Sequence, residues 1–383
     1  MVARDRDARK SPPAPANSVS RPRALSVPRR RRTATGAQTI RQAVLRAPGA
    51  LELAAIPFPV PADGEVVVRV RAALTCGTDL KTYRRGHPRV PFGPFGHEGA
   101  GDVAAVGPGV RGVDVGQAVV FMPTAPCGVC GPCRLGRDNL CETLFQEMGL
   151  GTYGDALRLP RRIVRRHLLP KPEGLPYIEA AFLEPLACVV HGWRRLGPLP
   201  GPRAAVIGLG PIGLLHVQEA RRRGLEVAAV GRRASARAQA VRAGASHAVD
   251  AGAGDPGTAL RAVWPEGPDV VIECTGSDAI WCAAPAWAAS GGKVLLFGGL
   301  PGGTMPQFDA TRLHYGEVDL IAAFHYGTED VHTALGLLSS GAVRPGPLIT
   351  GVRPLDDVVQ VFRDLDRGAG AKYALVPDGT AWV

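Results

Sequence analysis

The sequence predicts an α/β protein that joins a doubly wound parallel sheet to a second, β-rich domain. In the second half of the chain, short apolar strands alternate with helical or mixed segments, which is typical of a parallel sheet covered by helices on both faces. We expect six strands there, at residues 204–208, 226–230, 247–250, 269–273, 293–297 and 318–324. In the first half, short β-rich stretches are separated by tight turns, as in a compact β-barrel.

Ordered structure is expected to begin near Thr39. Residues 41–46 and 65–75 are rich in strand-forming side chains and are parted by a stretch that contains proline and glycine. Residues 102–121 alternate valines with glycines, which favours short strands joined by turns. A helix is predicted over Glu179–Trp193, ahead of a linker rich in proline and glycine.

The last part of the chain again contains short strands, which we expect at 348–350 and 373–377. We therefore predict that the chain returns to its first domain after the doubly wound sheet. The predicted layout is a basic tail at 1–38, a β-rich domain at 39–195, a dinucleotide-binding domain at 196–326 and the return at 327–383.

Composition excludes several classes of protein. Of the 383 residues, 45% are hydrophobic, which is ordinary for a globular chain. No run of about 18 apolar residues is present, so no membrane span is expected. Basic residues near the N-terminus are not followed by an apolar core, so we predict no secretory signal. The expected location is the cytoplasm, where thiols stay reduced or bind metal.

The net charge of +11 is unevenly distributed. Residues 1–35 carry +8 of it and are rich in Arg, Pro, Ala and Ser, so this segment is predicted to be disordered. The run Arg29–Arg32 leaves one remote alternative open, a non-catalytic protein that binds nucleic acid through this tail. No aromatic or helical pattern accompanies the charge, which favours an inert tail and no nucleic-acid partner.

Four of the eight cysteines lie in one short run with the spacing C-x2-C-x2-C-x7-C. They are Cys127, Cys130, Cys133 and Cys141. Four thiolates this close together suit a tetrahedral soft-metal site, and zinc is the usual occupant. An iron–sulfur cluster is the rival, but its usual run has a shorter last gap followed by proline, whereas Glu142 follows here. Disulfides would require an oxidising compartment, which no other feature supports.

A glycine-rich turn follows the first strand of the predicted parallel sheet. The turn is G-L-G-P-I-G, comprising Gly208, Leu209, Gly210, Pro211, Ile212 and Gly213. Between a strand and a helix, this pattern predicts a Rossmann dinucleotide site. The glycines permit the tight turn, the approach of the backbone to the pyrophosphate and close helix–strand packing, and the helix N-terminus offers amides to the phosphates.

The end of the second strand of this sheet indicates which nicotinamide cofactor is used. A carboxylate that would bind the ribose hydroxyls is expected there, but the strand ends at Gly231 and is followed by Arg232, Arg233 and Arg237. Guanidinium groups suit a 2′-phosphate, and no carboxylate repels it. We therefore predict that NADP is preferred over NAD, with Gly231, Arg232 and Arg237 in the site.

Several further motifs together carry a family resemblance. They are C-G-T-D-L-K-T-Y-R-R-G at 76–86, G-H-E-G-A-G at 96–101, the cysteine run, E-P-L-A at 184–187 and G-L-G-P-I-G. With these motifs the chain resembles the zinc-dependent medium-chain alcohol dehydrogenases, especially the branch with sorbitol and threonine dehydrogenases. The resemblance covers about 39–383. It implies that the β-rich domain is of the GroES-like (chaperonin-10-like) type.

The resemblance also implies a catalytic zinc site. Cys76, His97 and one acidic residue would hold this zinc, and both Glu98 and Glu184 occupy positions that bind the metal or its water in that branch. Thr78 matches a hydroxyl that relays the alcohol proton, and Asp79 matches a carboxylate that orients the histidine.

Three further positions are candidates for the walls of the substrate and nicotinamide pockets. Tyr153 either lines the substrate pocket or belongs to the core. His325 and Tyr326 follow the sixth strand, where members of the family approach the nicotinamide.

The implied function is hydride transfer between a secondary alcohol and NAD(P). The acidic residues beside Cys76 and His97 favour the polyol branch, so a sugar alcohol, cyclitol or amino-cyclitol is the expected substrate. The alternative is an NADPH-dependent ketone or aldehyde reductase of the same fold, which the arginines after the second strand favour. The family suggests a homodimer or homotetramer.

Overall fold

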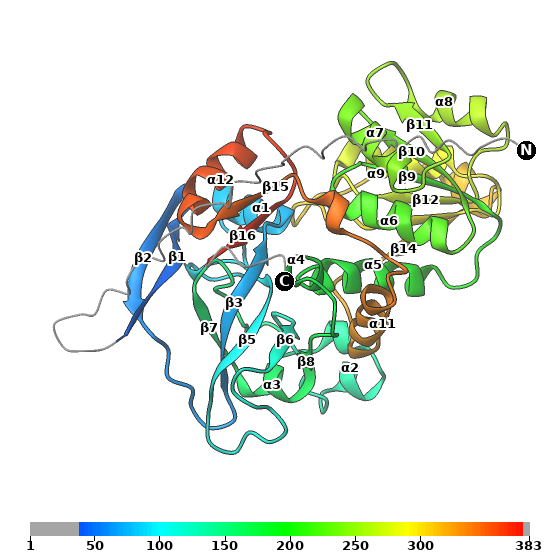
Figure 1. The fold of residues 1–383 in the computed structure, drawn as a ribbon. Coiled ribbons are helices and arrows are strands. Elements are labelled where there is room, and N and C mark those ends of the chain that lie inside the picture. Colours follow the sequence, from blue (N-terminus) through cyan, green and yellow to red (C-terminus); the bar gives the residue numbers. More distant parts are fainter. Residues whose placement is uncertain (1–37, 378–383) are drawn as a thin grey trace, which may run out of the picture.

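The protein is described from a computed structural model that covers residues 38–377, and the basic segment with its predicted disorder lies outside this range. Two β-rich regions sit side by side, one built on antiparallel strands and one on a parallel sheet (Figure 1). No helix within the described residues is long and apolar enough to cross a membrane.

The parallel region is a six-stranded sheet, and all of its neighbouring strands run in the same direction. In sheet order the strands are β11 (His247–Asp250), β10 (Glu226–Gly231), β9 (Arg203–Ile207), β12 (Val270–Glu273), β13 (Lys293–Leu296) and β14 (Asp319–Ala322). The order reverses beside β9, which creates the crevice at which nucleotides bind in such sheets. The six predicted strands are all present, although the last is shorter than expected.

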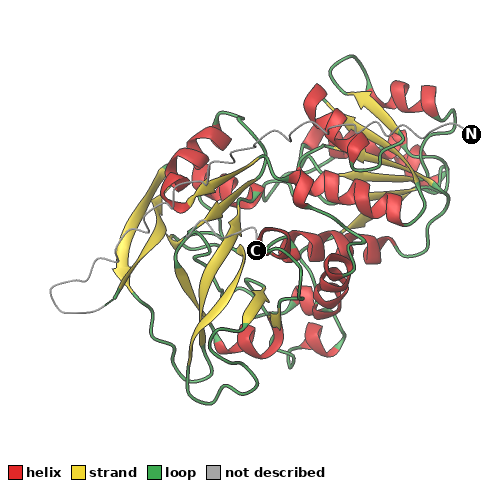
Figure 2. Cartoon of the chain, viewed as in Figure 1, coloured by secondary structure: helices red, strands yellow, loops and turns green. Residues whose placement is uncertain are grey.

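Helices cover both faces of this sheet (Figure 2). One face packs against α5 (Leu183–Leu196), α6 (Pro211–Arg222) and α7 (Ala234–Arg242). The other face packs against α8 (Pro256–Val263), α9 (Asp278–Trp287) and α10 (Ala310–His314). Alternate residues of one strand enter the two cores, as Val206 and Ile207 of β9 show. Burial on both faces explains why the strand sequences are apolar throughout.

The antiparallel region contains a seven-stranded sheet and a three-stranded sheet. The larger follows the order β15 (Gly351–Pro354), β16 (Tyr373–Val376), β3 (Val66–Leu74), β5 (Glu98–Val106), β6 (Ala118–Phe121) and β8 (Leu168–Pro170), with β7 (Ala156–Leu159) paired to β3. The smaller follows the order β2 (Ala50–Pro57), β1 (Thr39–Ala47) and β4 (Gly93–Pro94). The C-terminal strands thus lie beside strands from the first third of the chain (Figure 1).

The remaining helices are distributed over both regions. They are α1 (Gly77–Arg85), α2 (Gly131–Arg134), α3 (Arg161–His167), α4 (Tyr177–Ala180), α11 (Thr328–Ser339) and α12 (Val358–Asp366), with 3₁₀ turns η1 (Asp138–Leu140), η2 (Gly346–Leu348) and η3 (Leu355–Asp357). Helix α11 packs against α5, so the segment after β14 joins the helical layer before the chain reaches β15.

Two predicted elements differ from the structure because of proline. The single helix expected over Glu179–Trp193 is divided into α4 and α5, since the ring of Pro185 would clash with the carbonyl four residues earlier in a continuous helix. The strand expected at 348–350 is wrong: η2 occupies Gly346–Leu348 and the strand begins at Gly351. Pro347 lacks an amide hydrogen and has a fixed φ, which suits the 3₁₀ turn.

Candidate functional site

A group of three potential metal ligands lies where β3 and β5 run side by side. The ligand atoms of Cys76, His97 and Glu98 all lie within 4.8 Å of one another. Cys76 immediately precedes α1, and its Sγ accepts a hydrogen bond from the amide of Thr78 at 3.4 Å. Glu98 opens β5 and is paired in register with Leu74 of β3. Backbone pairing therefore brings together residues about 20 positions apart in the sequence.

The imidazole of His97 is oriented by a buried carboxylate. His97 Nδ1 lies 2.8 Å from Asp79 Oδ1, which leaves Nε2 on the opposite side of the ring. Tyr153 donates its phenolic proton to the other oxygen of Asp79 and also lies 3.0 Å from the carbonyl of Leu74. Tyr153 is fully buried, so it belongs to the core and supports Asp79. Burial and the Asp79 charge raise the pKa of Tyr153, which keeps the phenol protonated.

A buried lysine from the end of the chain also reaches this group. Lys372 lies just before β16, and its Nζ is 2.5 Å from Glu98 Oε2 and 3.0 Å from the carbonyl of Thr75. Both side chains are almost completely buried. Burial raises the pKa of Glu98 to about 7, although the charge of Lys372 opposes the rise. Glu98 Oε1 is buried without a hydrogen-bond partner, so this oxygen remains available for a cation.

Glu184 lies near this group but outside its 4.8 Å limit. It occupies the first turn of α5, and Cys188 Sγ donates to its Oε1 at 3.7 Å, which is a weak contact. Burial raises the pKa of the Glu184 carboxyl, while the charge of His97 lowers it. Of the two acidic candidates, only Glu98 therefore belongs to the compact group with Cys76 and His97.

A thiolate, an imidazole and a carboxylate oxygen form a donor set that suits zinc. The unpartnered oxygen of Glu98 lies beside the His97 ring and the Cys76 thiol, which contact each other, and this arrangement fits a bound cation better than an empty core. Burial and the charge of Glu98 raise the pKa of the Cys76 thiol, while the charge of His97 opposes the rise, so the thiolate form would depend on the bound cation.

The second metal-ligand group is the cysteine run. The sulfur atoms of Cys127, Cys130, Cys133 and Cys141 lie within 4.8 Å of one another. Amides of the loop point at them: those of Val129 and Cys130 donate to Cys127 Sγ at 3.4 and 3.3 Å. These hydrogen bonds lower the pKa of the Cys127 thiol to about 6. A closed set of four thiolates is the donor arrangement of a structural zinc site.

The cysteine lobe is tied to the segment that follows β14. Asn139 Nδ2 donates to the carbonyl of Phe324 at 3.0 Å, and Thr328 Oγ1 donates to Asp138 Oδ2 at 2.7 Å. Within the same segment, His325 Nε2 lies 2.6 Å from Thr124 Oγ1. The lobe therefore fixes a segment of the parallel region beside the antiparallel region. No local sequence pattern indicates this link, because its partners are about 190 residues apart.

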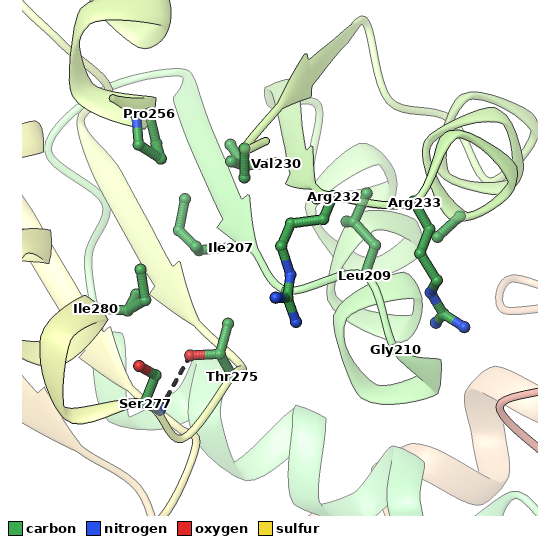
Figure 3. A pocket seen from close by; sticks show the side chains of 14 residues that line it. Ile207, Leu209, Gly210, Val230, Arg232, Arg233, Pro256, Thr275, Ser277 and Ile280 are labelled. Carbon is green, nitrogen blue, oxygen red and sulfur yellow. Dashed lines mark hydrogen bonds between the residues drawn. The ribbon is translucent and has the colours of Figure 1, made fainter. Parts of the chain in front are cut away.

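A hollow of about 670 Å³ lies at the ends of β9 and β10 (Figure 3). Gly208 has a φ of +96°, and a Cβ at Gly213 would lie 1.9 Å from the carbonyl oxygen of Gly208, so both positions require glycine. A Cβ at Gly210 would meet nothing within 4 Å, which leaves open space before the N-terminus of α6. That first turn contains no acidic residue and no side-chain cap, as a pyrophosphate site requires.

The predicted cofactor residues divide into two groups in the structure. Of the glycine-rich turn, the lining of the hollow includes Gly208, Leu209 and Gly210. Pro211, Ile212 and Gly213 do not line it and instead begin α6.

The arginines after β10 also fall into two groups, those that line the hollow and one that does not. Gly231, Arg232 and Arg233 line the hollow, and in Figure 3 both arginine side chains extend on its Leu209 side. Arg237 does not line it: its guanidinium pairs with Asp250 at 2.8 Å and donates to the carbonyls of Gly231 and Arg232. Arg233 therefore lies where sequence analysis expected Arg237. The reason is that Arg237, one helical turn into α7, reaches back over the strand end.

Comparison with known proteins agrees with this geometry. The alcohol dehydrogenase GroES-like domain model matches residues 62–172, and the zinc-binding dehydrogenase model matches residues 211–340. Sorbitol dehydrogenase of Bos taurus is 30% identical over 349 residues, which cover 88% of this chain and 95% of that protein.

Two further relatives give the same picture. A 2-dehydro-3-deoxy-L-galactonate 5-dehydrogenase of Pseudoalteromonas atlantica is 30% identical over 318 residues, covering 82% of this chain and 92% of that protein. A protein of Sinorhizobium meliloti 1021, described as a zinc-binding dehydrogenase bound to NADP, superposes with a TM-score of 0.82 at 30% identity, covering 89% of this chain and 100% of that chain. The predicted GroES-like and Rossmann domains are thereby confirmed. The chain belongs to the zinc-dependent medium-chain alcohol dehydrogenases and is similar to sorbitol dehydrogenase.

Proposed function

We propose that this dehydrogenase oxidises a secondary hydroxyl of a polyol, a cyclitol or an amino-cyclitol, with NADP as the preferred cofactor. The observation that carries the proposal is the compact group of Cys76, His97 and Glu98, combined with a nucleotide-sized hollow in the same chain. Relatives named for sorbitol and for a sugar acid support a hydroxyl-rich substrate. The reaction moves a hydride from the carbinol carbon to the nicotinamide and releases the hydroxyl proton, which leaves a ketone.

Cys76, His97 and Glu98 would hold the catalytic zinc, and the cysteine lobe would hold the structural zinc. When bound, the catalytic zinc supplies Lewis-acid stabilisation of the alkoxide. Asp79 holds the ring of His97 in one orientation, since it bonds Nδ1. Glu184, close by on α5, would accept a proton or hydrogen bond at the open side of the group. Thr78 lies exposed at the start of α1, where its hydroxyl would receive the substrate proton.

Zinc content and coenzyme turnover together test this proposal. We expect two zinc ions per chain and reduction of NADP⁺ in a screen of polyols, cyclitols and amino-cyclitols. The same screen run with ketones and NADPH measures the reductive direction, which the two arginines in the hollow favour as the second candidate. One zinc per chain and no turnover in either direction would contradict the proposal.

The cofactor preference is tested at the end of β10. Gly231→Asp is expected to lower the NADPH/NADH ratio of kcat/KM by about 10- to 100-fold, because a carboxylate there repels the 2′-phosphate. A Cβ at this position would lie 2.8 Å from Leu209 Cδ1, so the added side chain also displaces Leu209. Gly231→Asn makes nearly the same steric change without the charge and should leave the ratio unchanged. An equal ratio in wild type and Gly231→Asp would contradict the NADP preference.

We also propose that the chain forms a homodimer or homotetramer. Strand β14 is an edge of the parallel sheet, with β13 as its neighbour on one side. Met305 and Tyr315, which precede β14 in the chain, are 85% and 81% exposed. An unpaired edge strand and exposed apolar side chains favour association with a second copy.

A further inference from the structure

A single arginine contacts two neighbouring aromatic rings that come from different parts of the fold. The guanidinium carbon of Arg89 is 5.2 Å from the ring centroid of Phe145 and 5.0 Å from that of Phe324. Arg89 belongs to the loop after α1, Phe145 follows the cysteine lobe, and Phe324 follows β14. The ring centroids of Phe145 and Phe324 are 6.2 Å apart, so the guanidinium packs on one side of this ring pair. The two cation–π contacts favour one position for the guanidinium although the residue is exposed.

No acidic partner balances the charge of Arg89 within the part of the chain that the structure describes. Among residues 38–377, no ion pair or side-chain hydrogen bond engages this guanidinium, whereas Arg84, five residues earlier, pairs with Asp366 at 2.6 Å. The backbone amide of Arg89 donates to His87 Nδ1 at 3.1 Å, which fixes the loop locally. All five N–H donors of a positioned guanidinium are therefore free to bind a planar anion.

This arginine lies on the side of the fold that contains the candidate metal group. The ring of Phe324 lies 5.7 Å from that of His325, and the ring of Phe145 lies 5.5 Å from it. Burial lowers the pKa of His325 to about 3, and the charges of His97 and Arg89 both act in the same direction on this imidazole. His325 is thus within electrostatic reach of both residues. The charges of Arg89 and His97 also act together on His87, so the guanidinium lies within electrostatic range of the histidine of the metal-ligand group.

We propose that Arg89 binds a carboxylate carried by the substrate, so that among hydroxyl-rich substrates a polyhydroxy acid is preferred over the matching neutral polyol. The inference rests on the proposed function, since the reacting hydroxyl is assigned to the group of Cys76, His97 and Glu98. A carboxylate offers two oxygens to the planar fork of the guanidinium, which a neutral hydroxyl cannot match in charge or geometry. A relative that is 30% identical is named for a sugar acid, and this is consistent with such a substrate.

Matched substrates test this inference. D-Gluconate and sorbitol have the same carbon chain and differ in the terminal carboxylate, and sorbitol 6-phosphate carries a phosphate instead. We expect kcat/KM for gluconate to exceed that for sorbitol by at least about 100-fold, because an unpaired charged group at the site rejects the neutral analogue. Arg89→Gln should remove most of this advantage, chiefly by raising KM for gluconate. Arg85→Gln, which removes an exposed charge at the end of α1, is the matched control.

Three results would overturn the inference. They are a wild-type preference for sorbitol, a preference for the phosphate over the carboxylate, and an equal effect of Arg89→Gln on all three substrates. Calorimetric binding of gluconate to the zinc-loaded protein with NADP⁺ decides the matter even without turnover: a loss of at least about tenfold in Arg89→Gln but not in Arg85→Gln supports the role of Arg89. Absence of coenzyme reduction with every substrate would count against the proposed function, while the binding result would still stand.

Discussion

Replacing Cys76 with serine is expected to lower kcat/KM by at least about 10³-fold while the chain keeps one zinc ion. A metal that stabilises the alkoxide contributes several kcal/mol to the transition state, and each 1.4 kcal/mol is about tenfold in rate. Serine removes the thiolate from the group with His97 and Glu98 and leaves the four cysteines of the lobe intact. Metal analysis should therefore fall from two zinc ions per chain to one.

Cys188→Ser is the matched control for this substitution. Cys188 also lies near the candidate site, where its Sγ contacts Glu184 at 3.7 Å, but it belongs to neither metal-ligand group. It should keep two zinc ions and most of the activity. Loss of both metals in Cys76→Ser would show that the two sites are not independent. Full activity in Cys76→Ser would remove Cys76 from the proposed chemistry.

The fold could be predicted largely from local patterns. The parallel sheet is visible because its strands are buried on both faces and therefore continuously apolar, and Gly208 and Gly213 mark the turn that precedes α6. The errors occur where proline changes the backbone locally, at Pro185 and Pro347. The predicted helix runs across Pro185 and the predicted strand begins directly after Pro347, so the local patterns do not show the effect of each proline ring on the backbone.

The candidate site was less predictable, because tertiary contacts complete it. Cys76, His97 and Glu98 stand in recognisable motifs, but Lys372 reaches Glu98 from 274 residues away, and a lone lysine before an apolar strand gives no hint of this. The pairing of β16 with β3 produces the contact. Similarly, Arg237 and Arg233 differ in role because of the direction in which α7 leaves the strand, which the order of residues does not reveal.

Replacing Lys372 with methionine is expected to destabilise the fold strongly when the catalytic zinc is missing. Breaking a buried ion pair costs about 3–5 kcal/mol, because the remaining charge is left without a partner. Lys372 and Glu98 are 2% and 0% exposed in their side chains, so water cannot replace the lost contact. We propose to measure the free energy of unfolding by urea titration in the Cys76→Ser background, which should lack this zinc. In the zinc-loaded wild-type background the cost should be smaller, since the cation then compensates Glu98.

The double variant Glu98→Gln/Lys372→Met separates charge from packing. Without the carboxylate, loss of the lysine should cost far less. The cost of Lys372→Met in the presence of Glu98, minus its cost in the Glu98→Gln background, gives the interaction energy of the pair.

The free energy of unfolding should depend on pH with a definite sign. Because the folded pKa of Glu98, about 7, exceeds its ordinary value of 4.5, its contribution to stability is present at low pH and is lost as the pH rises through 7. Lys372 lowers that pKa, so its removal should cost more at pH 8 than at pH 5, where Glu98 is protonated. An equal cost at both pH values would show that Lys372 acts through packing alone.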